Sequence, residues 1–334
     1  MADRNRRLVL AERPSGMVNE STTRLEEPEL PELGPGEALA KVRYISIDPT
    51  IRTWMDDAPG YLPPIGVGEV VRSGGVAEIV QSNSERYSPG DLVFGLTGWQ
   101  EYVIADEGQR ALQILPAGVS PTAALGVLGL NGTTAYFGLL DVGKLKEGDV
   151  VVISGAAGAT GSAAGQIAKI KGAAKVVGIA GGPQKCSWIV DELGFDAAID
   201  YKNDDVAARL RELCPDGIDV YFDNVGGAIL DACLAQIAMR GRVVLCGAIS
   251  SYNEAGAQGI SNYAALIIRR GRMEGFIVLD YFDRLADAQA ELAGWLGEGR
   301  LKSAEHVVEG LEHAPDALNL LFTGGNTGKV VVRV

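Results

Sequence analysis

A glycine-rich turn is the strongest chemical signal in the sequence. The apolar run 150–153 leads through Ser154 into a segment with small residues at Ala156, Gly158 and Gly161, and an alanine-rich stretch follows. Small residues at this spacing allow a tight turn, a close approach of the backbone to a pyrophosphate, and close packing of a helix on a strand. The N–H groups and positive dipole at the helix N-terminus would then attract the phosphates. The segment therefore predicts a dinucleotide site; the alternative is an ordinary strand-to-helix turn.

The end of the following strand indicates which nicotinamide cofactor fits. An acid about 20 residues after the glycine turn would hold a ribose 2′-hydroxyl and repel a 2′-phosphate. Here the apolar run 176–180 is followed by Gly181 and Gly182 without an acid, and the cation Lys185 follows shortly. These features favour NADPH, with Lys185 as a contact of the 2′-phosphate; a solvated surface lysine is the alternative. Tyr201 could cover the same phosphate or the adenine.

Cysteine and histidine are distributed in a way that argues against a catalytic zinc site. Zinc prefers thiolate and imidazole ligands, yet neither residue type occurs before Cys186, and the two histidines, His306 and His313, come near the C-terminus. No two of the four cysteines have CxxC spacing, so a disulfide scaffold is not indicated either. We therefore predict no metal in the site. Negative charge formed during a reaction would have to be stabilised by the cofactor and by hydroxyl donors.

The elements that would position these residues change in kind near residue 120. Before it, short β-like stretches are separated by turn residues, which predicts a small, mostly antiparallel β domain. From residue 145, apolar runs alternate with helical patterns, which predicts parallel strands joined by crossover helices. The β-like stretches are 37–47, 66–72, 76–81 and 92–94; the later strands are 150–153, 176–179, 220–222 and 243–246; and the helices are 162–171, 185–193, 229–239 and 284–296. Two final strands, 306–309 and 329–334, could return to the first domain.

Composition excludes several classes of protein. A chain of 334 residues, 47% hydrophobic and 22% charged, is long enough to form two domains with sizeable cores. Its formal net charge of −13 comes from scattered acids, which argues against binding to nucleic acid or to anionic lipid. No apolar run approaches the ~18 residues of a membrane-spanning helix. We therefore expect a cytoplasmic protein that contacts neither membrane nor nucleic acid.

Five further motifs give the sequence a family resemblance. They are IDPTIR at 47–52, GTTAYFGLL at 132–140, YFDNVGG at 221–227, CGAISSYN at 246–253 and NTGK at 326–329. With the glycine turn, they resemble the medium-chain dehydrogenase/reductase superfamily, and within it the leukotriene B4 12-hydroxydehydrogenase/prostaglandin reductase group, which includes bacterial curcumin reductase and plant double-bond reductases. The resemblance covers nearly the whole chain. It implies an α/β fold: a GroES-like, mostly antiparallel β domain at 1–122 and 305–334, and a Rossmann domain with a doubly wound parallel sheet at 123–304.

The resemblance also assigns residues to a cofactor site. Asn224 and Cys246 fall at the carboxyl ends of predicted parallel strands, which is independently where open sheets of this kind bind ligands. By motif match, the residues implied to bind NADPH are Gly158, Ala159, Thr160, Gly161, Lys185, Tyr201, Asn224, Cys246, Gly247, Ala248, Ile249, Ser250, Ser251, Tyr252, Phe276, Ile277, Val278 and Asn326.

Two tyrosines are implied to contact the substrate. Tyr252 matches a tyrosine that stabilises an enolate oxygen or passes on a proton; the alternative is a hydroxyl that only holds the cofactor loop. Tyr61 resembles a second substrate-side tyrosine, and Trp54 and Met55 could share its wall, unless all three are core residues. Many relatives carry Tyr where this chain has Thr50, so a substrate-facing tyrosine is absent there.

The function implied by the resemblance is NADPH-dependent, zinc-independent reduction of the α,β carbon–carbon double bond of enals and enones. Hydride would add at the β-carbon, an enolate would form, and a proton would be added at the α-carbon. A quinone reductase of the same superfamily would share the fold and cofactor, and an NADPH-binding protein with little turnover is a third possibility. The resemblance also implies a homodimer, with the strand region 273–279 as the contact.

Overall fold

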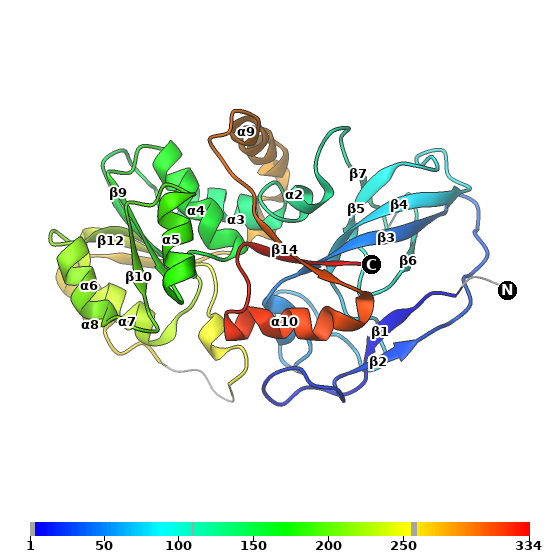
Figure 1. Ribbon diagram of the computed structural model, residues 1–334, viewed down its shortest axis with the longest axis horizontal. Coiled ribbons are helices and arrows are strands. Elements are labelled where there is room, and N and C mark those ends of the chain that lie inside the picture. The colour runs from blue at the N-terminus through cyan, green and yellow to red at the C-terminus, as the bar shows by residue number, and fades with distance from the viewer. Residues whose placement is uncertain (1–3, 109, 255–258) are drawn as a thin grey trace. The chain divides into compact units, whose positions relative to one another are not determined.

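The computed structural model describes residues 4–108, 110–254 and 259–334, and the chain divides into two units. Unit 1 comprises Met1–Leu125 and Glu305–Val334, and unit 2 comprises Gly126–Ala304. Each unit has its own sheet (Figure 1). The C-terminal segment therefore contributes its strands to the sheet formed by the N-terminal part of the chain.

Unit 2 is built on a six-stranded sheet, counted over the described residues, in the order β10-β9-β8-β11-β12-β13. All of its strand pairs are parallel, which confirms the predicted sheet with crossover helices. The central strands are continuous apolar runs because both of their faces are buried. The elements are α3 (Leu130–Phe137), η1 (Gly138–Val142), β8 (Val150–Ser154), α4 (Ala159–Ile170), β9 (Lys175–Ala180), α5 (Pro183–Asp191), β10 (Ala197–Asp200), α6 (Val206–Leu213), β11 (Ile218–Asp223), α7 (Gly227–Ala235), β12 (Ile237–Leu245), η2 (Ile249–Ser251), α8 (Ala264–Arg269), β13 (Arg272–Gly275), η3 (Val278–Arg284) and α9 (Leu285–Gly297).

The strand order of unit 2 fixes where a ligand can bind. The chain winds outward from β8 through β9 to β10, then returns to the other side of β8 with β11 and continues to β13. The order therefore reverses between β8 and β11. In open parallel sheets, the loops at such a reversal diverge to opposite faces and leave a crevice at the carboxyl ends of the strands.

Helices cover both faces of this sheet. α6, α7 and α8 pack on one face, in a core cluster that includes Leu210 and Leu234. α4 and α5 lie on the other face (Figure 1), where Phe195 fills the space beside α4 and Ile189 packs near Gly178. The close fit depends on glycine, because a Cβ atom on Gly165 of α4 would lie only 1.8 Å from the Phe195 ring.

Unit 1 contains a seven-stranded sheet, again over the described residues, with the path β14-β15-β3-β4-β5-β7 and β6 paired to β3. Its pairs are antiparallel except β14 with β15, which confirms a mostly antiparallel domain completed by the C-terminal strands. A separate two-stranded sheet pairs β1 with β2. The elements are β1 (Arg7–Leu10), β2 (Thr23–Glu26), β3 (Ala38–Ile47), α1 (Thr50–Trp54), β4 (Gly74–Ser82), β5 (Leu92–Leu96), β6 (Tyr102–Ala105), β7 (Gln113–Ile114), α2 (Pro121–Leu125), β14 (Glu305–Glu309), η4 (Leu311–His313), α10 (Ala314–Thr323) and β15 (Lys329–Arg333).

Two sequence-based expectations about elements are wrong. The stretch 66–72 is not a strand: Glu69 accepts a hydrogen bond from the Gly66 N–H at 2.8 Å and Gly68 has φ of +90°, so the segment turns and makes only an isolated bridge from Val70 to Val9. The helix expected at 229–239 ends at Ala235. Its last residues belong to β12, because short apolar runs fit a helix or a buried strand equally well by pattern.

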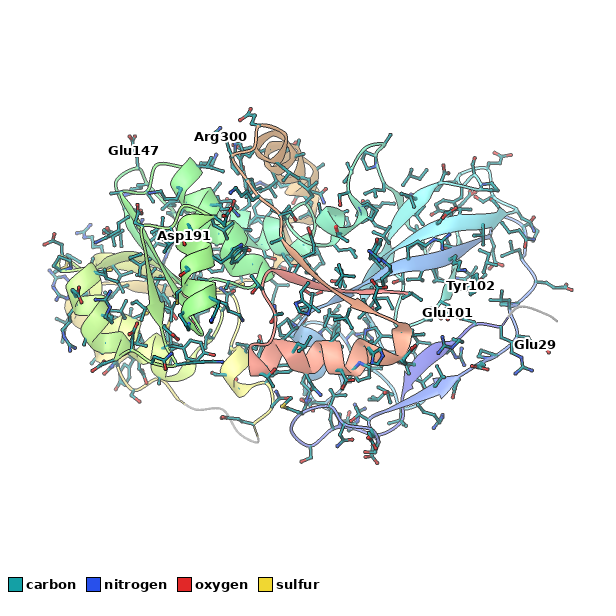
Figure 2. All side chains as sticks on the ribbon, in the orientation of Figure 1. Glu29, Glu101, Tyr102, Glu147, Asp191 and Arg300 are labelled. Atoms are coloured by element: carbon teal, nitrogen blue, oxygen red, sulfur yellow. The ribbon has the colours of Figure 1, made fainter. Side chains whose placement is uncertain are left out.

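The surface is consistent with the acidic composition. Glu147, Asp191 and Arg300 of unit 2 are exposed, and Glu147 and Arg300 project from the edge of the molecule in Figure 2. None of the helices in the described ranges is both long enough and apolar enough to cross a membrane.

The contact between α4 and Phe195 leads to a stability prediction. Replacing Gly165 with Ala should lower the free energy of unfolding by up to about 2 kcal/mol, because the overpacking penalty of about 1–3 kcal/mol outweighs the roughly 1 kcal/mol gained from the better helix former. Urea unfolding followed by circular dichroism measures the change.

Gly294 is the matched control for this substitution. It lies in α9, is exposed, and a Cβ atom there would meet nothing within 4 Å. Gly294→Ala should therefore stabilise unit 2 by up to about 1 kcal/mol. If both variants moved stability in the same direction, packing of α4 on Phe195 would not be the deciding contact.

Candidate functional site

The glycine turn between β8 and α4 has no space for side chains at its critical positions. Gly155 has φ of +59°, a conformation that L side chains rarely adopt. A Cβ atom on Gly161 would lie 2.3 Å from the Gly155 carbonyl oxygen, and one on Gly158 would lie 3.3 Å from it. α4 begins at Ala159 with no side-chain cap, so no side chain competes for the N–H groups of its first turn. This backbone cradle fits the pyrophosphate of a dinucleotide.

A single buried carboxylate joins the carboxyl ends of β8 and β11. Asp223 ends β11 and is fully buried. Its Oδ1 accepts hydrogen bonds from the Ser154 hydroxyl at 2.9 Å, the Tyr221 hydroxyl at 2.7 Å, and the Val225 and Gly226 N–H groups at 3.0 Å each. Because Ser154 ends β8, this carboxylate sits where the strand order reverses and fixes the positions of both strand ends.

Asn224 and the start of the next loop are held by the same junction. The Asn224 N–H donates to the Ser154 hydroxyl at 2.9 Å, and its Nδ2 donates to the Ser154 carbonyl at 2.7 Å. After β12, the N–H groups of Cys246 and Gly247 both donate to the Asp223 carbonyl, at 2.9 and 3.0 Å. Three neighbouring strand ends are therefore tied together through Asp223.

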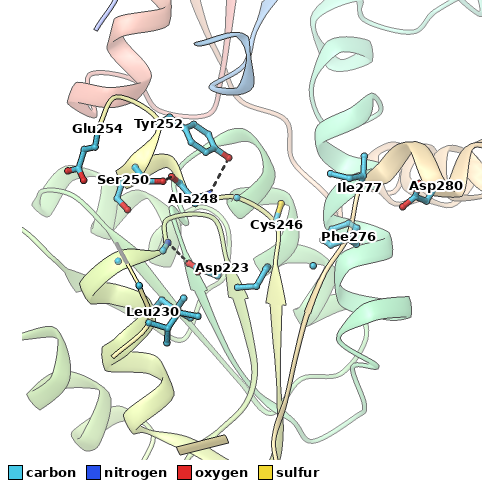
Figure 3. Close-up of a pocket in the computed structure, with 18 residues that line it drawn as sticks. Asp223, Leu230, Cys246, Ala248, Ser250, Tyr252, Glu254, Phe276, Ile277 and Asp280 are labelled. Atoms are coloured by element: carbon cyan, nitrogen blue, oxygen red, sulfur yellow. Dashed lines mark hydrogen bonds between the residues drawn. The ribbon is translucent and has the colours of Figure 1, made fainter. Parts of the chain in front are cut away.

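The segment from Cys246 to Tyr252 folds back on itself beside this junction. The Ser250 and Ser251 hydroxyls donate to backbone carbonyls of Val225 and Ala248, at 2.7 and 2.9 Å. The Tyr252 hydroxyl instead accepts a hydrogen bond from the Ala248 N–H at 3.1 Å, drawn as a dashed line in Figure 3. A loop that fixes its own tyrosine in this way presents a phenol at a defined position.

A pocket of about 710 Å³ opens beside this segment within unit 2 (Figure 3). Among the predicted cofactor residues, those that line it are Cys246, Gly247, Ala248, Ser250, Ser251, Tyr252, Phe276 and Ile277. Asp223, Gly226, Leu230 and Asp280 line it as well, although the sequence did not single them out. Ile249 and Val278 are half-buried next to lining residues but do not line the pocket.

The thiol in this pocket is not an acid at neutral pH. Burial raises the pKa of Cys246 to about 12, and the negative charge of Asp223 adds to the effect. Cys246 therefore remains a neutral thiol, and the Tyr252 hydroxyl lines the same pocket.

A second group of residues gathers where β9 ends. The side chains of Tyr201 and Lys202 pack over Gly181: a Cβ atom there would lie 2.8 Å from the Tyr201 ring, 3.0 Å from its hydroxyl oxygen and 3.0 Å from Lys202 Cε. Burial lowers the pKa of the Lys185 ammonium, and the like charge of Lys202 lowers it further. Neither lysine forms a salt bridge with a carboxylate of the described residues. Two cations and a phenol around a glycine suit a 2′-phosphate, whose charge would relieve the repulsion.

The predicted site residues of unit 1 differ in burial. Tyr61 is 47% exposed and its ring lies edge-on to Trp54, with ring centroids 6.3 Å apart. Met55 is fully buried in the unit 1 core and contributes no wall to a binding site. Asn326 is buried, and its Nδ2 donates to the Gly328 carbonyl at 3.0 Å.

Two residues of the candidate site were missed by sequence reasoning. Asp223 stood within the YFDNVGG motif, but an acid at a strand end does not reveal that Ser154, on another strand, will donate to it. Lys202 directly follows Tyr201, and this adjacency was a usable signal. In the described part of the chain, no group of three or more His, Cys, Asp or Glu side chains could hold a metal ion.

Comparison with protein families gives matches in both units. Residues 6–114 match a family described as the N-terminal domain of oxidoreductase, and residues 159–293 match one described as zinc-binding dehydrogenase. Similar curated proteins include the putative NADP-dependent oxidoreductase YfmJ of Bacillus subtilis, 45% identical over 100% of this chain and 99% of the relative. They also include the NADPH-dependent curcumin reductase of Escherichia coli at 42% and the NADP-dependent 2-alkenal reductase of Nicotiana tabacum at 38%, each over 99% of this chain and 97% of the relative.

A solved structure agrees with these relatives. CurA from Vibrio vulnificus in complex with NADPH superposes with a TM-score of 0.93 and 42% identity, over 98% of this chain and 99% of that chain.

The lysine pair leads to a prediction about cofactor preference. Lys185→Ala should raise the KM for NADPH about tenfold and leave the KM for NADH nearly unchanged, because an ionic hydrogen bond to a phosphate is lost. Lys202→Ala should act in the same direction but less, since its side chain is more exposed to screening.

Steady-state kinetics with both cofactors measures these effects. Lys146→Ala is the control, because Lys146 is exposed and lies ahead of β8, at the amino end of the sheet. An equal loss with NADPH and NADH in the Lys185 variant would contradict the 2′-phosphate assignment.

Proposed function

The chain belongs to the medium-chain dehydrogenase/reductase superfamily, in the group of curcumin, 2-alkenal and prostaglandin reductases, and we propose that it reduces the α,β double bond of small enals and enones. It is an NADP-dependent oxidoreductase, and its cofactor is NADPH. The observation that carries the proposal is a tyrosine hydroxyl fixed at the wall of a pocket at the carboxyl ends of β11 and β12.

The proposed reaction balances in two steps. NADPH, when bound, would supply the hydride; its two electrons would form the new C–H bond at the β-carbon, and the electrons of the double bond would move to the substrate oxygen as an enolate. A proton added at the α-carbon completes the saturated carbonyl product. The residues of the chain must therefore stabilise one developing negative charge and allow one proton to arrive.

Tyr252 lines the pocket and carries a phenol, a hydrogen-bond donor suited to a developing oxyanion. The Tyr252 oxygen accepts from the Ala248 N–H, and a hydroxyl that accepts a hydrogen bond is polarised into a stronger donor. We assign Tyr252 the stabilisation of the enolate oxygen.

The remaining proposed contacts follow from the family. Gly158, Ala159, Thr160 and Gly161 would hold the pyrophosphate, with Asn224 and the segment from Cys246 to Tyr252 along the rest of the cofactor. The cofactor would also be contacted by Phe276, Ile277 and Val278, which follow β13, and by Asn326 of unit 1. Tyr61, exposed on unit 1, would contact substrate.

We also propose that the protein is a cytoplasmic homodimer. β13 is the edge strand of the unit 2 sheet, and an edge strand offers unpaired backbone groups to a second copy. Large apolar side chains are exposed nearby: Ile267 at 70%, Ile268 at 66% and Phe282 at 65%. Such a concentration is typical of a surface that another chain covers.

Steady-state NADPH oxidation with a panel of enals, enones and quinones tests the substrate class. We expect enals and enones to be consumed with stoichiometric formation of the saturated carbonyl product, identified by mass spectrometry. Preferential turnover of quinones would instead indicate a quinone reductase, and NADPH binding without turnover of any substrate would indicate a binding protein.

Tyr252→Phe tests the mechanism. The variant keeps the ring and removes one hydroxyl, so turnover of a simple enone should fall by up to ~10²–10³ while the Kd for NADPH changes little. Tyr263→Phe is the control, because Tyr263 is 61% exposed and does not line the pocket. A loss of NADPH affinity with unchanged turnover at saturation would mean that Tyr252 only holds the cofactor loop.

A further inference from the structure

The buried carboxylate of Asp223 is bonded in an unusually one-sided way. Four donors converge on Oδ1, whereas Oδ2 is buried and has no hydrogen-bond partner in the described part of the chain. Donors that converge on a carboxylate oxygen stabilise its ionised form. A purely structural role needs only Oδ1, so the second oxygen and the charge itself require another explanation.

Among the residues that the structure describes, no cation compensates this charge. Asp223 forms no salt bridge with any lysine, arginine or histidine of the described residues. The Ser154 and Tyr221 hydroxyls and the N–H groups at the start of α7 are dipoles, which weaken the local field but add no net positive charge. A buried ion of this kind normally has a charged partner.

The field of this carboxylate reaches the lining of the pocket. Asp223 itself lines the pocket together with Cys246 and Phe276 (Figure 3). Burial is the main cause of the raised pKa of Cys246, and the negative charge of Asp223 adds to it. A group that enters the pocket with a positive charge would therefore be stabilised relative to a neutral group of the same shape.

We propose that Asp223 is the electrostatic partner of the oxidised, cationic nicotinamide ring, so that the protein favours NADP+ over NADPH at the ring and makes bound NADPH a stronger hydride donor. Loss of a hydride would give the ring a single positive charge, which a carboxylate stabilises and a neutral side chain of the same shape does not. The charge of Asp223 thus stabilises the product side of the hydride transfer. This inference rests on the cofactor and on the assignment of the Cys246–Tyr252 segment to it, and does not depend on which substrate accepts the hydride.

The test is the ratio of the two cofactor affinities in Asp223→Asn. This variant has nearly the same shape and keeps an oxygen to accept the donors, but it removes the charge. We expect the Kd for NADP+ to rise about tenfold with little change in the Kd for NADPH, the size of effect that one charge has across roughly 12 Å at an effective dielectric constant of about 20. Calorimetry or fluorescence titration in the absence of substrate measures both constants.

Tyr221→Phe is the matched control, because it removes one donor to the same oxygen and keeps the carboxylate charge. It should leave the affinity ratio unchanged even if it lowers stability. An equal weakening of both cofactors in Asp223→Asn, or an equal change of the ratio in both variants, would overturn the proposal in favour of a structural role.

If Asp223→Asn does not fold, a binding measurement on the unmodified protein tests the proposed role of Asp223. NADP+ is compared with an analogue in which benzamide replaces nicotinamide, so that the ring has the same shape and no charge. The protein should bind NADP+ about tenfold more tightly than the analogue. Equal affinities would overturn the proposal. Both tests measure binding alone, so a failure to reduce enones would contradict the proposed function without affecting them.

Discussion

One carboxylate oxygen organises the functional end of unit 2. Asp223 Oδ1 receives donors from β8, from β11 and from the turn that starts α7, and the Asp223 carbonyl receives two N–H groups from the end of β12. The glycine turn, Asn224 and the segment that carries Tyr252 are all positioned relative to this one residue. Burying an ion costs free energy unless hydrogen bonds stabilise it, and here those bonds are the same ones that join the strand ends.

The hydrogen bonds around the pocket also indicate different roles for the polar side chains that line it. Ser250 and Ser251 use their protons to hold the backbone, so they act in the architecture of the loop. The Tyr252 oxygen accepts a hydrogen bond from the Ala248 N–H, and Cys246 is kept neutral by burial and by the charge of Asp223. The lining of the pocket therefore combines a phenol with the carboxyl groups of Asp223, Glu254 and Asp280.

Sequence reasoning recovered what depends on local pattern and missed what depends on strand order. The glycine turn was recognisable because its small residues all lie within seven positions of the sequence and pack against one another. A Cβ atom on Gly161 would lie only 2.3 Å from the Gly155 carbonyl oxygen. The partnership of Asp223 with Ser154 spans 69 residues and exists only because β8 and β11 are neighbours. Residues 237–239 were expected in a helix, and pairing with β11 places them in a strand instead. The substrate roles of Tyr61 and Tyr252 depended on family resemblance, since neither composition nor spacing points to a substrate.

The packing of Tyr201 and Lys202 over Gly181 has an evolutionary consequence. The simplest route from NADPH to NADH use is an acid at the end of the second strand, but a side chain at position 181 would collide with Tyr201 and with Lys202 Cε. Because both neighbours are exposed, a new side chain would push them aside rather than be excluded. One substitution at position 181 would thus introduce the acid and displace Tyr201 and Lys202 from their present positions at the same time. A change of cofactor preference in descendants of this chain would then be abrupt rather than gradual.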